Sequence, residues 1–233
     1  MSARTKSDLV EYTVIVEHLE QEISLWLLLE YRHVSRIHGK ERVWFTNVPR
    51  RYHKILSLYG RVFEKSVIAL LFERYIEPAQ TIVLDPQAQQ KLTFNDLITA
   101  RYIVIGGILG DHPPRGRTKT FITSRAPSGV KAFNIGEGQY SIDGAAYYVK
   151  YLIEHRGEEG FEYVDGVKIE TEHGYVYLPY RYPLVNGRPL LADGLEYYLK
   201  YRKLREDIWR EIREAQHRET QDLKTSLNSQ APQ

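Results

Sequence analysis

The chain has 233 residues, no cysteine and a formal net charge of +2. This length predicts one or two domains, and the missing cysteine excludes disulfides, cysteine zinc sites, iron–sulfur clusters and thiolate nucleophiles. No apolar run approaches the roughly 20 residues of a membrane span, and the N-terminus lacks a signal peptide. We therefore expect a cytoplasmic protein with no membrane segment.

Apolar runs and three- or four-residue spacings alternate along the chain. They predict, in order, a strand over 12–16, a helix over 22–38, a strand over 42–48, a basic helix over 50–59, a helix over 66–75, a strand over 81–84, a helix over 93–100, strands over 102–105 and 130–135, a helix over 141–155, short strands and hairpins over 161–183, and a last helix from Asp193. This alternation predicts an α/β fold with a mostly parallel sheet flanked by helices.

The ends of the chain differ from its middle. Residues 1–10 are polar and predict a flexible N-terminus, and residues 220–233 predict a disordered tail. Between them we expect one domain over 11–192 and an added C-terminal helix over 193–219.

The most unusual segment follows the strand over 102–105 without a break. It reads Gly106-Gly107-Ile108-Leu109-Gly110-Asp111-His112-Pro113-Pro114-Arg115. Ligands of open α/β sheets bind at the carboxyl ends of strands, and glycines allow the backbone to approach a ligand closely. The spacing is neither GxGxxG nor a Walker A loop, so a ligand loop and a sharp structural loop both remain open.

Two further loops follow strands in the same way, over 84–88 and 134–141. The second opens a helix whose backbone donors could bind an anion or a polar ligand edge. Three such loops together predict a pocket.

Asp111 is the only acid between positions 111 and 131, although the total charge is nearly neutral. The cations of this stretch are Arg115, Arg117, Lys119, Arg125 and Lys131. They could hold RNA phosphates or a ligand carboxylate, and a solvated surface is an equal alternative. A second basic candidate is the helix with Arg50, Arg51, His53 and Lys54.

Two carboxylates follow the first predicted strand. Glu17 and Glu20 could orient a cationic acceptor, or they could cap the following helix or pair with a neighbour. The histidines show no metal-ligand spacing, so we expect no metal.

The glycine segment, continuing to Arg117-Thr118, resembles the signature of a small SPOUT-class methyltransferase family of archaea and fungi, whose fungal members resemble protein arginine methyltransferases. The similarity covers residues 12 to 199. Further matching segments are Glu17-His18-Leu19-Glu20 (EHxE), Ser24, Trp26, Glu30 and Tyr31 (SxWxxxEY), Leu84-Asp85-Pro86 with Ala88 (LDPxA), Ile135-Gly136, Gln139, Ser141, Asp143 and Ala145, and Tyr180-Arg181-Tyr182 with Gly187-Arg188-Pro189. Tyr140, where an apolar Met is usual, and the charged helix after Tyr201 depart from the pattern.

The resemblance implies a C-terminal trefoil knot, which general topology rules make improbable, and S-adenosylmethionine held bent among the knot loops. The positions it implies for the cofactor are Leu84, Asp85, Pro86, Gly106, Gly107, Ile108, Leu109, Gly110, Asp111, Ile135, Gly136, Gln139 and Ser141, with Arg115 toward its carboxylate. The methyl group sits on a sulfonium, so transfer needs orientation rather than an enzyme nucleophile.

Three acceptor hypotheses remain. An arginine of a ribosomal-type protein would need carboxylates to orient it and take its proton, for which Asp111, Glu17 and Glu20 are the catalytic candidates. An RNA nucleotide, of rRNA or tRNA, would bind through Arg115, Arg117, Lys119, Arg125 and Lys131. A non-catalytic RNA-binding or assembly factor is the third, and whether the chain forms a homodimer stays open.

Overall fold

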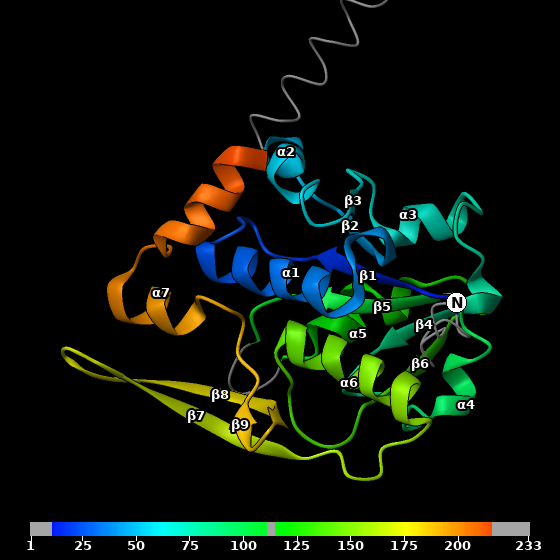
Figure 1. The fold of residues 1–233 in the computed structure, drawn as a ribbon. Helices are drawn as coiled ribbons and strands as arrows, with labels where there is room; N and C mark the ends of the chain where they lie inside the picture. Colours follow the sequence, from blue (N-terminus) through cyan, green and yellow to red (C-terminus); the bar gives the residue numbers. More distant parts are fainter. Residues whose placement is uncertain (1–10, 111–114, 216–233) are drawn as a thin grey trace, which may run out of the picture.

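The computed structural model describes residues 11–110 and 115–215. In them a six-stranded sheet has the order β3-β2-β1-β5-β4-β6, and every neighbouring pair is parallel (Figure 1). The strands are β1 (Thr13–His18), β2 (Val43–Thr46), β3 (Arg61–Val62), β4 (Thr81–Leu84), β5 (Tyr102–Gly107) and β6 (Lys131–Phe133). The predicted α/β class with a mostly parallel sheet is confirmed. The short edge strand β3 was not predicted.

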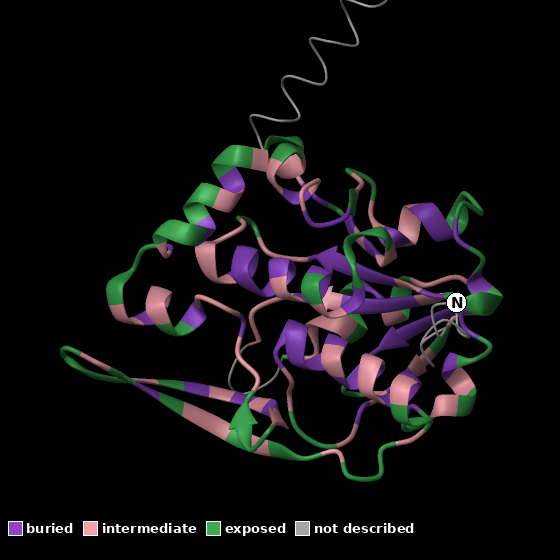
Figure 2. Ribbon diagram, viewed as in Figure 1, coloured by how far each residue is buried: buried purple, intermediate pink, exposed green. Residues whose placement is uncertain are grey.

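Side-chain alternation on β1 divides the interior into two cores. Val14 and Val16 belong to the larger core beneath α1 (Leu25–His38) and α6 (Ile142–His155), which cover one face of the sheet (Figure 2). Ile15 belongs to the smaller core on the other face, beneath α3 (Val67–Phe72). Burial on both faces explains why these strands are continuous apolar runs.

Serine residues set where three helices begin. Ser24, Ser66 and Ser141 each accept a backbone N–H from three residues further along, which satisfies one unpaired donor of the first turn. The first helix therefore starts at Leu25, three residues later than its predicted start. The other helical segments are short: α2 (His53–Leu56), α4 (Phe94–Leu97) and α5 (Arg117–Phe121).

A long hairpin follows α6 and projects from the body of the molecule (Figure 1). It consists of β7 (Tyr163–Thr171) and β8 (Gly174–Val185), and the two-residue strand β9 (Arg188–Pro189) pairs with β8. The hairpin was predicted, but its strands have nine and twelve residues and are not short.

The C-terminal segment is not the single helix predicted over 193–219. Helix α7 (Leu195–Tyr201) ends at Arg202, whose φ of 55° is left-handed, and a second helical segment covers 206–215. The buried Arg32 of α1 pairs with Asp193, which precedes α7, at 3.2 Å, and with Glu211 of the second helical segment at 2.5 Å. The predicted flexible N-terminus and disordered tail lie outside the described residues.

The trefoil knot stays a prediction. The segment after β6 pairs with the loop after β4, because the Asn134 N–H donates to the Gln90 carbonyl and the Leu92 N–H donates to the Asn134 carbonyl, both at 2.8 Å. In the described part of the chain no helix is long and apolar enough to cross a membrane.

Candidate active site

The loops after β4, β5 and β6 meet at the carboxyl edge of the sheet and enclose a cleft. The cleft has about 550 Å³ of open space, its mouth included. Its apolar walls come from Leu84, Ile105, Ile108, Ile135, Ile142 and Ala145. Since all strands run in parallel, their carboxyl ends share this edge, and the three loops singled out in the sequence do come together.

Most of the predicted cofactor residues line this cleft: Leu84, Asp85, Pro86, Gly106, Ile108, Ile135, Gly136, Gln139 and Ser141. Gly107, Leu109, Gly110 and Arg115 are not among its lining residues, and Asp111 lies outside the described residues. Gly138 and Tyr140, which lie in the predicted third loop, also line the cleft. Further lining residues that were not predicted are Ile105, Thr118, Ile142 and Ala145. In the sequence, Tyr140 stands out as a departure from the family pattern, and Thr118 belongs to the family signature.

Gly107 is required by packing rather than by the cleft. A Cβ at this position would overlap the Tyr31 hydroxyl, and it would lie 2.8 Å from Val16 and 2.9 Å from the Glu17 carbonyl. The Tyr31 hydroxyl donates a hydrogen bond to the Gly107 carbonyl at 3.2 Å. Helix α1 is thereby fixed against the end of β5.

Gly110 allows two of the cleft loops to touch. A Cβ there would overlap the side-chain amide of Gln139, which projects from the third loop. The Tyr180 hydroxyl of β8 donates to the Gly110 carbonyl at 2.7 Å. Gly110 therefore shapes the cleft from behind Gln139.

Two polar lining residues use their side chains within the protein. One carboxylate oxygen of the buried Asp85 accepts the Gln87 N–H at 2.9 Å and the other accepts the Thr123 hydroxyl at 2.7 Å. The Ser141 hydroxyl accepts the Gly144 N–H at 3.2 Å. These bonds fix the first and third loops, so both residues build the walls of the cleft.

A buried carboxylate holds the first turn of α6, which forms one wall of the cleft. Glu30 accepts the Trp26 indole N–H at 2.6 Å and the Ile142 backbone N–H at 3.1 Å. Complete burial, reinforced by the nearby carboxylate of Asp143, raises the pKa of Glu30 well above its usual range. Trp26 and Glu30, noted only as parts of a motif, thus position the start of α6.

The Glu17 carboxylate is turned away from the cleft. It is 2% exposed and accepts the Thr46 hydroxyl at 2.5 Å and the Val67 N–H at 2.8 Å. Burial raises the pKa of Glu17 to about 7. One alternative predicted that Glu17 caps the following helix, which is α1. Glu17 does accept a backbone N–H at a helix start, but the helix is α3.

His18, next to Glu17, supports the glycine loop from the other face of β1. Its Nδ1 lies 2.9 Å from the Tyr31 hydroxyl oxygen. Because that hydroxyl donates to Gly107, we assign the proton to Nδ1. Burial lowers the pKa of His18 to about 4, so the imidazole is neutral at physiological pH.

Glu20 joins the N-terminal loop to the glycine loop. Its Oε1 accepts the Leu109 N–H at 3.1 Å and an Arg117 Nη1 proton at 3.2 Å, and Arg117 Nη2 donates to the Leu109 carbonyl at 2.5 Å. Glu20 therefore already binds a guanidinium beside the candidate site, namely that of Arg117.

The cations of the predicted basic stretch do not form one patch. Arg117 pairs with Glu20, and the guanidinium of the exposed Arg125 lies 5.2 Å from the Phe121 ring centre. Arg115 and Lys119 are exposed. Lys131 begins β6, at the opposite end of that strand from the cleft. A common role for these five residues in substrate binding stays a prediction.

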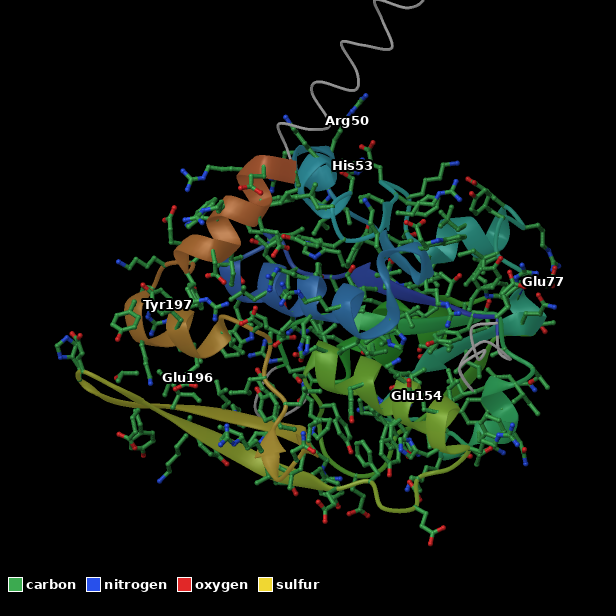
Figure 3. The ribbon with its side chains drawn as sticks, viewed as in Figure 1. Arg50, His53, Glu77, Glu154, Glu196 and Tyr197 are labelled. Atoms are coloured by element: carbon green, nitrogen blue, oxygen red, sulfur yellow. The ribbon has the colours of Figure 1, made fainter. Side chains whose placement is uncertain are left out.

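The second basic candidate lies on the α2 region, away from the hairpin, where Arg50 and His53 are labelled in Figure 3. Arg51 pairs with Glu22 at 2.5 Å, and His53 Nε2 lies 3.0 Å from the Val48 carbonyl. Half of this group is thus engaged locally. No cluster of three or more metal-ligating side chains occurs among residues 11–110 and 115–215.

The match to known proteins covers the sheet, the cleft loops and the hairpin. The family model described as "Protein arginine N-methyltransferase SFM1-like" matches residues 13–205. The chain belongs to the SFM1-like family. The resemblance drawn from the glycine segment and its companion motifs is thereby confirmed.

Sequence and structure agree on this relationship. Protein arginine N-methyltransferase SFM1 of Saccharomyces cerevisiae is 29% identical over 194 residues, which are 78% of this chain and 91% of the yeast protein. The crystal structure of yeast SFM1 complexed with SAM has a TM-score of 0.72 at 28% identity, covering 82% of this chain and 91% of that one. The structure complexed with SAH has a TM-score of 0.71, also at 28% identity, covering 84% and 96%.

Proposed function

We propose that this member of the SFM1-like family is a protein arginine methyltransferase that uses S-adenosylmethionine, bound in the cleft between the loops after β4, β5 and β6. The observation that carries the proposal is this cleft, in a chain matched by the family over residues 13–205. The yeast relative is a protein arginine N-methyltransferase whose structures are complexed with SAM and SAH.

The cleft suits the proposed cofactor in its chemistry. The apolar side chains of Ile105, Ile135 and Ile142 give it walls for a flat adenine ring. At Gly136 and Gly138, φ is +94° and +92°, which side-chain-bearing residues rarely adopt.

S-adenosylmethionine supplies an electrophilic methyl group on a sulfonium sulfur. The residues of this chain would supply the frame: Gly106 at the end of β5, Ile108 from the loop after it, and Gln139 from the loop after β6. Gln139 is held in place by close packing against Gly110. Orienting the two reactants in this way can contribute about 7–11 kcal/mol to lowering a barrier.

An arginine acceptor also needs a carboxylate, because its guanidinium is protonated and carries only donors. Glu17 is used inside the protein by Thr46 and Val67. Glu20 holds Arg117 and the Leu109 N–H, so we propose that it positions the glycine loop. Asp111 follows this loop directly in sequence, and we propose it as the group that takes the proton.

We propose a protein of the translation machinery, of the ribosomal type, as the acceptor, and hence a cytoplasmic location. An RNA acceptor is the alternative outcome. The test incubates the purified chain with methyl-labelled S-adenosylmethionine and total cell extract, followed by nuclease or protease digestion. We expect label that survives nuclease, is lost to protease, and appears as methylarginine after acid hydrolysis. Label lost to nuclease would contradict the proposal.

Two variants separate the roles of the carboxylates. Asp111→Asn is expected to abolish transfer while calorimetric binding of S-adenosylhomocysteine persists. Glu20→Gln is expected to weaken cofactor binding as well, because the Glu20–Leu109 bond orders the glycine loop. Full transfer by the Asp111 variant would exclude Asp111 as the proton acceptor.

A further inference from the structure

A second cavity lies where the strands of the sheet begin, at the opposite end of the strands from the candidate active site. We call this end the amino edge of the sheet. It has about 1250 Å³ of open space, including its wide mouth, and it runs along the first residues of β1, β2, β3 and β5. Thr13 pairs with Tyr102 and Trp44 pairs with Arg61 in the register of these strands. We call this cavity the amino-edge groove.

The groove carries excess positive charge. Its lining contains four cations, Lys40, Arg42, Arg61 and Arg101, against the two carboxylates of Glu11 and Glu41. Arg101 is paired with Glu11 at 3.0 Å. The remaining three cations face a single carboxylate, so the groove favours a ligand with several negative charges.

Aromatic rings interleave with these cations. Tyr12, Trp44 and Tyr102 line the groove, and the Trp44 and Tyr102 ring centres are 5.7 Å apart. The Arg42 guanidinium lies 5.2 Å from the centre of the Tyr12 ring. Tyr12 is itself only 4% exposed, so the half-buried rings of Trp44 and Tyr102 are the ones on which a base can stack while the cations contact phosphates.

Arg61 is the cation whose position is best fixed. Its guanidinium lies 5.3 Å from the Trp44 ring centre, 4.9 Å from that of Phe63 and 5.6 Å from that of Tyr75. A guanidinium stacked on rings keeps its N–H edge available, and it loses less freedom when it binds a phosphate bidentately. Arg61 is exposed at the start of β3, so a ligand can reach it.

We propose that the amino-edge groove binds single-stranded RNA, with phosphates on Lys40, Arg42 and Arg61 and a base against Trp44 or Tyr102. Its length along the starts of four neighbouring strands favours an extended strand over a free nucleotide. The aromatic rings favour RNA over an acidic peptide, because every base offers a face for stacking. The groove is separate from the cofactor cleft, so this inference holds or fails independently of the proposed methyl transfer.

The test measures binding of a fluorescein-labelled 12-nucleotide oligouridine to the full chain by anisotropy, between 50 and 300 mM salt. The double variant Lys40→Gln/Arg61→Gln is expected to bind at least about tenfold more weakly. Its slope of log affinity against log salt should be shallower by about 1.4, since each phosphate contact to a single strand contributes about 0.7. Tyr102→Leu should weaken binding with the salt slope unchanged, and Tyr102→Phe should restore it.

A matched control removes the same charge elsewhere. Lys203→Gln/Arg210→Gln takes two exposed cations from the C-terminal segment and is expected to bind the oligouridine like the wild type. The proposal is overturned if this control loses binding while the groove variant does not, or if polyglutamate competes as well as unlabelled RNA. Unchanged S-adenosylhomocysteine binding and circular dichroism in the groove variant show that its fold is intact.

Discussion

The buried carboxylate of Glu17 predicts a pH-dependent stability that one substitution should remove. Burial holds its pKa at about 7, against 4.5 in the unfolded chain. Between these values the folded state keeps a proton that the unfolded state has lost. Stability is therefore full below about pH 4.5 and falls as the pH rises to about 7, by about 3 kcal/mol at 1.36 kcal/mol for each pH unit.

Glu17→Gln mimics the protonated carboxyl, and its amide oxygen can still accept the Thr46 hydroxyl and the Val67 N–H. We expect the variant and the wild type to have similar free energies of unfolding at pH 5. At pH 8 the variant should be more stable by about 2–3 kcal/mol. Urea unfolding at pH 5, 6, 7 and 8 measures the gap, and Glu64→Gln, at an exposed position, controls for the loss of one negative charge. A gap that is constant across this range would refute the assigned burial of the charge.

Three further predictions test the cleft, the ion pairs of Arg32 with the C-terminal segment, and the stability of the fold at acidic pH. Gly110→Ala should reduce S-adenosylhomocysteine affinity at least about tenfold by displacing the neighbouring amide, whereas Gly157→Ala, which meets nothing within 4 Å, should be silent in the same calorimetric titration. Arg32→Gln should cost about 3 kcal/mol of unfolding free energy in urea, because it leaves two carboxylates without their buried partner, while Glu206→Gln at an exposed pair should cost less than about 1 kcal/mol. Burial lowers the pKa of His38 to about 3, so its contribution is lost as the pH falls below about 6.5; relative to His38→Gln, the wild type should lose about 1.4 kcal/mol for each pH unit between 6 and 4.

Apolar runs in the sequence were enough to predict the central strands of the sheet. The strands over 12–16 and 81–84 are apolar because both of their faces are buried, and their pattern is visible without the fold. Strand β3 has two residues and exists because Arg61 and Val62 pair with β2, which no local pattern indicates. The break at Arg202 likewise interrupts a regular apolar spacing with no glycine or proline to mark it.

The candidate site shows the same division. The glycines after β5 and the three strand-end loops located the cleft, because parallel strands bring their carboxyl ends to one edge. The role of Glu17 could not be predicted in this way. The sequence around a carboxylate after a strand is the same whether the side chain faces a ligand or bonds a distant N–H. For Glu17 the donor is the Val67 N–H, 50 residues away in the sequence.

A sheet of parallel strands only has two chemically different edges. Here the carboxyl edge carries the apolar cleft, and the amino edge carries the cations and rings of the groove. The six residues of β5 separate them by about 20 Å, at about 3.3 Å per residue. A ligand in the groove therefore lies too far from the cleft to touch a ligand bound there, so the two sites can be occupied independently.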